Sequence, residues 1–148
     1  MKKQIALIAH NIRSTHNVGS IFRTCDGLGV NKIYLSGYTP YPAVVNDSRL
    51  PHISTKLTSQ INKTALNAQD FVDWRHVDSA QEAIAQLREA GYLIAGLEQH
   101  PNSKPLPSFD TPNKIALVLG EEVNGVSPEI LNLCDEILEI PMLGKKES

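Results

Sequence analysis

The order of the predicted elements indicates an α/β protein in which helices cover both faces of a mostly parallel sheet. Three observations carry this prediction. Apolar runs of strand length alternate along the chain with segments whose apolar residues recur at helical spacing. Several of these runs are continuously apolar, as is expected of strands that are buried on both faces. The 148 residues contain no internal repeat and no linker, so residues 1–148 are expected to form a single domain.

Six segments have the length and composition of strands. They are Ile5–Ala9, Lys32–Ser36 with Val30 before it, Phe71–His76, Tyr92–Leu97, Ile115–Leu119 and Glu136–Ile140. An irregular loop, residues 38–52, follows the second strand, and a polar, proline-rich loop, residues 98–113, follows the fourth. Loops of this length in a compact domain are usually functional covers or disordered segments.

The first helix is predicted from its cap and its apolar stripe. Asn17 is expected to cap this helix through its side-chain oxygen. The buried stripe consists of Val18, Ile21, Phe22 and Cys25. The next helical segment, residues 53–68, is weakly marked and leaves Lys56 and Lys63 available to solvent.

The last two helices have clearer boundaries. Asp78 is expected to cap the third helix, with Gln81 completing a capping box and Gly91 closing the C-terminal end. Ser127 followed by Pro128 predicts the start of the fourth helix, because a capping side chain precedes a proline in the first turn.

The charge of the chain is unevenly distributed. The net charge of −2 gives no global basic signature of a nucleic-acid-binding protein. Residues 1–75 carry nine Lys and Arg against four Asp, a balance of +5, whereas residues 76–148 have a balance of −7. This asymmetry allows one basic face for a polyanion on an acidic body, and it is equally compatible with two solvated faces of unequal sign.

Neither the cysteines nor the histidines have the spacing of a metal site. Cys25 and Cys134 lie far apart on the apolar sides of predicted helices, so buried free thiols are expected. The first apolar run of five residues is shorter than the core of a signal peptide, and no run approaches the length of a transmembrane helix. We therefore expect a cytoplasmic protein with no metal ion and no membrane contact.

Three polar segments of unusual composition follow predicted strands: NIRSTHN at residues 11–17, GEEVNG at residues 120–125 and PMLGKKES at residues 141–148. Parallel sheets bind ligands at the carboxyl ends of their strands, so these segments are the candidates for a site. GEEVNG has two glycines but lacks the Lys and Ser or Thr of a phosphate loop, and its two acids would repel phosphate. No dinucleotide turn follows the first strand, and no G-x-S-x-G hydrolase motif is present.

In combination, these segments resemble the motifs of the SpoU family of the SPOUT superfamily, the S-adenosylmethionine-dependent RNA ribose 2′-O-methyltransferases. NIRSTHNVGSIFRTCDGLGV is similar to the first motif, IALVLGEEVNGV to the second, EILEIPMLGKKES to the start of the third and KTALNAQDFVDW to the middle of the family. The resemblance implies an α/β knot that holds the cofactor near the C-terminus, and a homodimer. It also implies an enzyme that methylates a ribose 2′-hydroxyl of tRNA or rRNA.

The resemblance further implies the residues of the site. Asn17 and Arg23 match the functional positions of the first motif and Glu122 matches the acid of the second, so these three are the expected catalytic residues. The residues expected to bind S-adenosylmethionine are Leu97, Gly120, Ile140, Met142 and Ser148. The residues expected to contact RNA are Arg13, Arg23 and Lys63.

Arg23 is the residue on which the expected reaction depends most. A guanidinium with a pKa above about 12 is a poor general base. Arg23 is therefore expected to bind a backbone phosphate and to stabilise the developing alkoxide, while Asn17 orients Arg23 or the ribose. Each residue also has a plainer interpretation. Asn17 can be only a helix cap, Arg23 a solvated helix residue, and Glu122 a cap of its own turn or a partner of Lys145 or Lys146.

The sequence departs from the family pattern at its end. It stops at Ser148, where the family continues through Leu-Asn and a final helix that supplies an active-site Asn, part of the cofactor pocket and the threading end of the knot. We therefore expect the C-terminal knot segment to be truncated. The alternative function is that of a non-catalytic RNA-binding or assembly protein that retains the methyltransferase fold.

Overall fold

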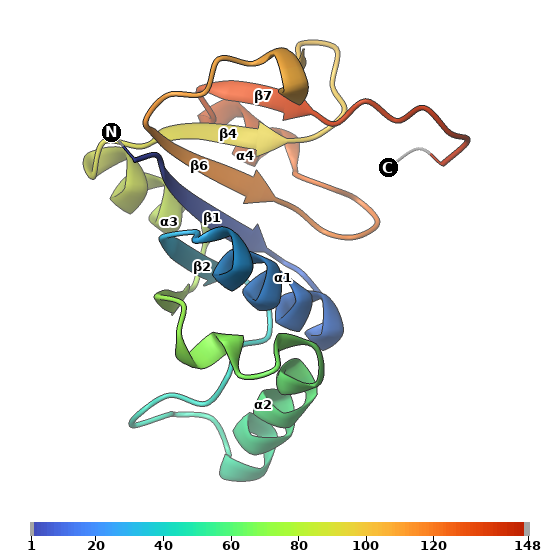
Figure 1. The fold of residues 1–148 in the computed structure, drawn as a ribbon. Helices are drawn as coiled ribbons and strands as arrows, with labels where there is room; N and C mark the ends of the chain where they lie inside the picture. The colour runs from blue at the N-terminus through green and yellow to red at the C-terminus, as the bar shows by residue number, and fades with distance from the viewer. Residues whose placement is uncertain (1, 147–148) are drawn as a thin grey trace.

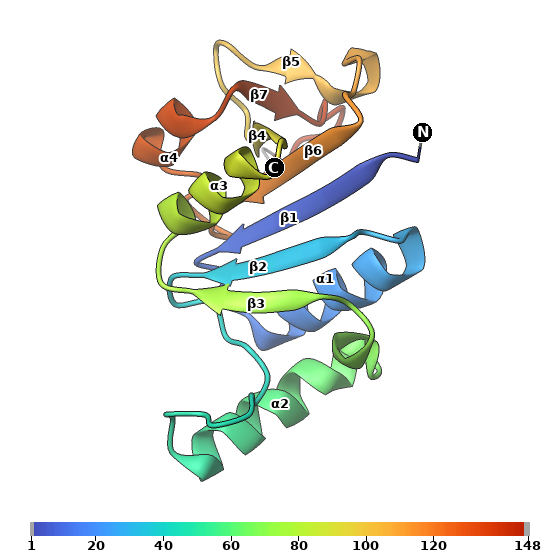
Figure 2. The ribbon, with the colours of Figure 1, turned by 90° about the vertical axis from the view of Figure 1, so that its left-hand side faces the viewer.

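The computed structural model describes residues 2–146, and within this range seven strands form one parallel sheet (Figures 1 and 2). The order across the sheet is β3-β2-β1-β6-β4-β7-β5. The strands are β1 (Gln4–His10), β2 (Lys32–Ser36), β3 (Trp74–Val77), β4 (Leu93–Leu97), β5 (Lys104–Pro105), β6 (Lys114–Leu119) and β7 (Glu136–Glu139). The α-helices are α1 (Thr15–Leu28), α2 (Pro51–Ala65), α3 (Ala80–Glu89) and α4 (Pro128–Leu133), and the short 3₁₀ helices are η1 (Ala68–Asp70) and η2 (Leu106–Ser108).

Helices cover both faces of the sheet, with α1 and α2 on one side and α3 and α4 on the other (Figure 2). In the central strand β1, Leu7 and Ala9 pack on the side of α1, in a core that includes Phe22. Ala6 and Ile8 of the same strand belong to the core on the side of α3. This alternation is the arrangement expected of a strand buried on both faces. The predicted α/β class is confirmed.

Helices α1 and α2 pack closely because α1 has no side chain at Gly19. A Cβ atom at this position would overlap the side chain of Thr64 and the carbonyl oxygen of Ile61. The Thr64 hydroxyl also donates a hydrogen bond of 2.7 Å to the carbonyl oxygen of His16. The two helices therefore form one packed unit beneath the loop that follows β1.

Two of the predicted helix caps are wrong. Ser14, not Asn17, caps α1, since its hydroxyl accepts a hydrogen bond from the Asn17 N–H. Ser79, not Asp78, caps α3, since its hydroxyl accepts from the Glu82 N–H. Ser, Asn and Asp cap helices about equally well. A run of such residues therefore predicts a helix start but does not determine which side chain makes the bond.

Other predicted boundaries differ from the structure at the edge of the sheet. The strand predicted at residues 71–76 is β3, which begins at Trp74 and ends at Val77. The loop of residues 98–113 contains β5 and η2, which were not predicted. The predicted start of α4 is confirmed, because the Ser127 hydroxyl accepts a hydrogen bond from the Ile130 N–H.

None of the helices within residues 2–146 has the length and apolar character needed to cross a membrane.

Cys25 is a buried free thiol, as predicted, whereas Cys134 is a free thiol that is only partly buried. Residues 140–146 leave the sheet beyond β7 (Figure 1). The α/β knot and the truncation of its C-terminal segment remain predictions.

Candidate active site

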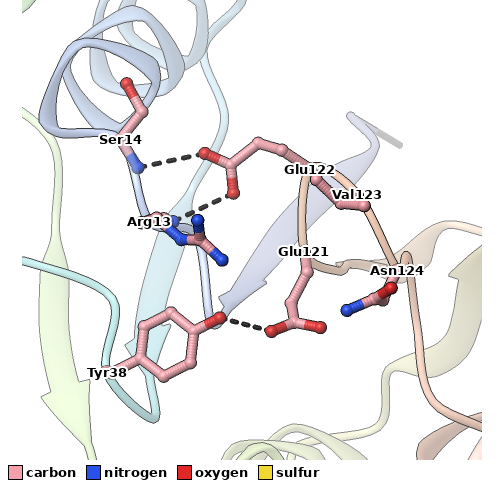
Figure 3. A pocket seen from close by; sticks show the side chains of 7 residues that line it. All are labelled: Arg13, Ser14, Tyr38, Glu121, Glu122, Val123 and Asn124. Atoms are coloured by element: carbon pink, nitrogen blue, oxygen red, sulfur yellow. Dashed lines mark hydrogen bonds between the residues drawn. The ribbon is translucent and has the colours of Figure 1, made fainter.

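The loops that follow β1 and β6 meet at one edge of the sheet. These strands are neighbours, and their register pairs Ala9 with Leu119, so both end at the same level. The loop after β1 consists of residues 11–14 and leads into α1, and the loop after β6 consists of residues 120–127 and leads into α4. Two of the segments that the sequence singled out therefore lie against each other (Figure 3).

Glu122 joins these two loops. Its Oε1 atom accepts a hydrogen bond of 2.9 Å from the Arg13 N–H, and its Oε2 atom accepts one of 3.0 Å from the Ser14 N–H (Figure 3). Oε2 also accepts from the side-chain amide of Asn17 at 3.1 Å. A carboxylate at the start of α1 satisfies N–H groups that have no partner within the helix and interacts favourably with the helix dipole.

The environment of Glu122 stabilises its ionised form. Partial burial would raise the pKa of this carboxyl group, but hydrogen bonds from the Arg13 and Ser14 N–H groups, from its own backbone and from Asn17 outweigh burial. The pKa of Glu122 consequently lies below its ordinary value. None of the ion pairs within residues 2–146 joins Glu122 to Lys145 or Lys146, which was one of its plainer interpretations.

Asn17 is oriented by this contact and not by a capping role. Because its side-chain NH₂ group donates to Glu122, the amide oxygen of Asn17 remains as an acceptor. Ser14 takes over the cap of α1. The structure therefore brings Asn17, Glu122 and the backbone of Arg13 together, as the resemblance implied for the first two residues.

The turn after β6 depends on its glycines. Glu121 and Gly125 exchange two backbone hydrogen bonds of 3.1 and 2.9 Å. Gly125 has a φ of +67°, and a Cβ on Gly120 would overlap the backbone of Gly125. On the far side of the turn, a carboxylate oxygen of Glu98 accepts from the Val126 N–H at 2.9 Å. The backbone of this turn is thus held from both sides and presents Glu122 towards α1.

A second contact between loops was not found from the sequence. The Tyr38 hydroxyl, at the start of the loop after β2, donates a hydrogen bond to the Glu121 carboxylate (Figure 3). This bond, followed by one from Asn124, lowers the pKa of Glu121, and it raises the pKa of Tyr38. The sequence indicated only that Tyr38 follows a predicted strand. Its position beside Glu121 depends on the order of the strands in the sheet, which no local pattern specifies.

The expected cofactor residues line two adjoining hollows at the ends of β4, β6 and β7. A hollow of about 220 Å³ is lined in part by Leu97, Ile140 and Met142. A more open hollow of about 610 Å³ shares Leu97 with the first and includes Gly120. Ser148, the fifth expected cofactor residue, lies outside the described residues.

Two of the three residues expected to contact RNA lie apart from this junction. Arg23 is exposed on α1 and Lys63 is exposed near the end of α2, and neither lines the hollows described above. The Arg13 side chain is also exposed, and it lines the hollow of about 260 Å³ between the loops after β1 and β6. Residues 2–146 contain no group of three or more His, Cys, Asp or Glu side chains that could hold a metal ion.

Comparison with known proteins gives one matching family. The sequence model of the SpoU rRNA Methylase family matches residues 4–148 of the chain. The tRNA (guanosine(18)-2'-O)-methyltransferase of Aquifex aeolicus (strain VF5) is 27% identical over 147 residues, which are 99% of this chain and 63% of the relative. A protein of Staphylococcus aureus (strain COL) named for the TrmH family of tRNA/rRNA methyltransferases is 28% identical over 142 residues, 96% of this chain and 51% of the relative. The chain therefore spans between half and two thirds of the length of these relatives.

Solved structures show the same fold. The A. aeolicus TrmH/SpoU tRNA modifying enzyme superposes with a TM-score of 0.77 at 26% identity, covering 99% of this chain and 67% of that one. The AdoMet-bound rRNA methyltransferase from Sinorhizobium meliloti superposes with a TM-score of 0.82 at 19% identity, covering 100% of this chain and 51% of that one. The second likeness shows the fold alone.

Proposed function

The chain belongs to the SpoU rRNA Methylase family, and from this premise we propose that it uses S-adenosylmethionine to methylate a ribose 2′-hydroxyl of tRNA or rRNA, acting as a homodimer. The observation that carries the proposal is the junction at Glu122. It holds Asn17 and the loop after β1 at the strand edge where the hollows for a cofactor open. The name of the A. aeolicus relative supports the same reaction class.

The hollows at the ends of β4, β6 and β7 fit S-adenosylmethionine in their chemistry. Leu97, Ile140 and Met142 provide apolar walls, and Gly120 leaves the backbone of the turn open to close approach. Sites for small molecules are typically apolar with a few placed polar groups. The cofactor supplies a methyl group on a positively charged sulfonium, and the carboxylate of Glu98 on the wall of both hollows favours a cation.

The transfer forms a bond between the ribose oxygen and the methyl carbon, breaks the bond between that carbon and sulfur, and releases the hydroxyl proton. Arg23 binds a backbone phosphate of the RNA and stabilises the developing alkoxide, and this phosphate relays the hydroxyl proton to solvent water. The free amide oxygen of Asn17 orients the ribose hydroxyl or Arg23. Glu122 has a lowered pKa and both of its oxygens are engaged, so we assign it to positioning Asn17 rather than to accepting the proton.

RNA binding is proposed for three exposed cations: Arg13, which lines the hollow between the loops after β1 and β6, and Arg23 and Lys63, which lie on α1 and α2. Arg side chains are suited to phosphate because they can donate two parallel hydrogen bonds. Phosphate contacts position RNA without reading its sequence.

Mapping of ribose methylation in cells tests the proposed function. In total tRNA and rRNA from a strain that lacks the gene, we expect one or a few 2′-O-methyl groups to be lost and to return when the gene is restored. A strain in which every 2′-O-methyl group persists would contradict the proposal.

The alternative is a non-catalytic RNA-binding protein that retains the fold. Calorimetric titration with S-adenosylmethionine separates the two functions, because only the enzyme needs the cofactor. Heat of binding that disappears in a Gly120→Leu variant supports the enzyme, since the new side chain would overlap the turn and fill the hollow. RNA binding without any cofactor binding would support the alternative.

A further inference from the structure

A further hollow, of about 490 Å³, lies beside the candidate active site at the ends of β2 and β3. Its wall includes Arg13, Tyr38, Tyr41, Arg49 and His76. It shares Arg13 and Tyr38 with the smaller hollow between the loops after β1 and β6. The methyl-transfer chemistry proposed above uses none of its aromatic residues.

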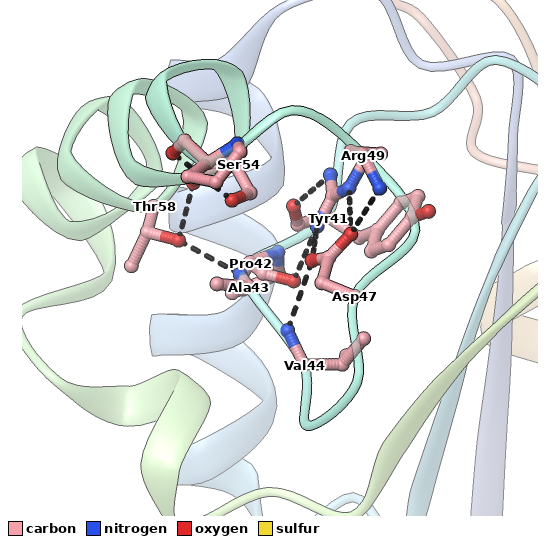
Figure 4. Close-up of polar contacts among 9 residues, drawn as sticks. Tyr41, Pro42, Ala43, Val44, Asp47, Arg49, Ser54 and Thr58 are labelled. Atoms are coloured by element: carbon pink, nitrogen blue, oxygen red, sulfur yellow. Dashed lines mark hydrogen bonds and ion pairs between the residues drawn. The ribbon is translucent and has the colours of Figure 1, made fainter.

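The loop that forms this hollow is held in shape by its own contacts. The Arg49 guanidinium lies 3.6 Å from the centre of the Tyr41 ring, and the His76 ring stacks on Tyr41 at 4.1 Å between centroids. Two groups this close to one ring centre must occupy its opposite faces. Arg49 is fixed in turn by Asp47 at 2.7 Å and by the carbonyl oxygens of Tyr41 and Pro42 at 2.9 and 3.0 Å (Figure 4). Both faces of Tyr41 are covered, so this stack is a preformed wall.

Tyr38 presents a free aromatic ring at the mouth of the same hollow. Tyr38 is 52% exposed, and its hydroxyl donates a hydrogen bond to Glu121, which restrains the ring without covering it. Arg13 lies beside it as an exposed cation that lines both hollows. An aromatic ring next to a cation is the combination that binds single-stranded nucleic acid, because the base stacks on the ring while the cation meets the phosphate.

We propose that this hollow receives the base of the RNA nucleotide next to the methylated one, with Tyr38 as its stacking surface and Arg13 as the partner of the phosphate between them. The inference rests on the proposed function for the identity of the neighbouring ribose. Arg13 and Tyr38 line both hollows. An RNA whose reacting ribose lies beside Glu122 in the smaller hollow would therefore extend past these two residues into the larger hollow. An aromatic ring can stack on any base. We therefore expect the protein to bind RNA that carries bases more tightly than an abasic backbone, whatever the base sequence.

Fluorescence anisotropy with two labelled probes tests the inference: a single-stranded oligo(A) RNA dodecamer, and a dodecamer of the same ribose-phosphate backbone without bases. We expect the protein to bind the base-bearing probe about 5- to 100-fold more tightly than the abasic probe. Tyr38→Leu should abolish this preference by weakening only the base-bearing probe. Equal affinity for both probes, no binding of either, or equal weakening of both by Tyr38→Leu would overturn the inference.

Two further variants separate stacking from other effects. Tyr38→Phe keeps the ring but removes the bond to Glu121, so the preference for bases should persist. If Tyr38→Phe behaves like Tyr38→Leu, the contact with Glu121 and not stacking is responsible, and the inference fails. Phe71, elsewhere on the surface, is 77% exposed, and Phe71→Leu should change neither affinity. Thermal unfolding of each variant verifies that it is folded.

The base could also come from the cofactor's own adenosine, and a third titration distinguishes this source. With S-adenosylhomocysteine as the ligand, Tyr38→Leu should leave the affinity unchanged. A loss of affinity would place the cofactor's adenine in the hollow and overturn the inference. The RNA titrations contain no cofactor, so they remain decisive whether or not methyl transfer is found. Methyl transfer without any base preference would refute only this inference.

Discussion

At the scale of single residues, Glu122 is the link on which the geometry of the candidate active site depends. It accepts hydrogen bonds from Arg13 and Ser14, which are 109 and 108 residues away in the sequence. A charged acceptor at the start of a helix typically stabilises a protein by about 1 kcal/mol. Removing it should therefore loosen the loop after β1 together with the start of α1.

Replacing Glu122 by Gln should make the protein less sensitive to acid. The pKa of Glu122 is lowered in the folded protein, so its ionised form stabilises the fold above the ordinary value of 4.5, and this contribution is lost as the pH falls below it. Urea unfolding at about pH 6 and about pH 3.5 measures the effect. The free energy of unfolding should fall more steeply with acid in the wild type than in Glu122→Gln. Parallel losses in the two proteins would contradict the assigned role.

Replacing Arg23 by Ala should reduce the rate of methyl transfer by about 100-fold, because the developing alkoxide loses its cationic partner. RNA affinity, measured with the same RNA, should fall only a few-fold, since Arg13 and Lys63 remain. Arg75→Ala is the matched control: it removes the same exposed charge from β3, beside Tyr34 on the face of the sheet covered by α3. Near-normal turnover of Arg23→Ala with unchanged RNA affinity would refute this assignment.

The residues of the first and second motifs could be predicted from the sequence, but their contacts could not. Asn17 and Glu122 were selected by resemblance, and the structure brings them to 3.1 Å. That Ser14 caps the helix while Asn17 turns to Glu122 depends on β1 and β6 being neighbours, which no local pattern specifies. Tyr38 was missed for the same reason, since its partner comes from a loop 83 residues away.

At the scale of elements, the packing of α1 on α2 supports the loop that carries Asn17. Gly19→Ala should lower the free energy of unfolding by about 2 kcal/mol or more, because the added methyl group would overlap Thr64 and the backbone of Ile61. Gly27→Ala is the matched control in the same helix. A Cβ at Gly27 meets nothing within 4 Å, so this variant should gain up to about 1 kcal/mol from helix propensity.

Urea denaturation of both variants measures the difference. Equal stability of Gly19→Ala and Gly27→Ala would show that the two helices are not held at the distance observed.

Elements with a strong internal pattern were predicted well, and elements made only by tertiary contacts were not. The central strands β1 and β6 are continuously apolar and were placed to within one residue at each end. The two-residue strand β5 exists through its pairing with Leu138 and Glu139 of β7, which leaves no periodic signal in its own sequence. The late start of β3 has a similar origin, because its residues pair only with β2.

At the scale of the whole molecule, the fold places the loops after β1, β2 and β6, which are distant in the sequence, along one edge of a parallel sheet. A hollow of about 400 Å³ lies between α1 and strands β1 and β6, with Leu28 exposed at its rim. Such a surface is compatible with the proposed homodimer.

Light scattering coupled to size-exclusion chromatography tests the homodimer. We expect a mass close to twice the 16.3 kDa of one chain at micromolar concentration, with dissociation on dilution if the interface is weak. A mass of one chain at every concentration would leave a monomer as the functional unit.

Methyl transfer from S-adenosylmethionine to a ribose of RNA, with Arg23 stabilising the developing alkoxide, is the reaction proposed for this chain. The most direct measurement is the transfer of a labelled methyl group from S-adenosylmethionine to total RNA from a strain that lacks the gene, followed by analysis of the nucleosides. We predict that label accumulates in a 2′-O-methyl nucleoside with the wild type and about 100-fold more slowly with Arg23→Ala. Label confined to a base, or RNA that is bound but never labelled, would contradict the claim.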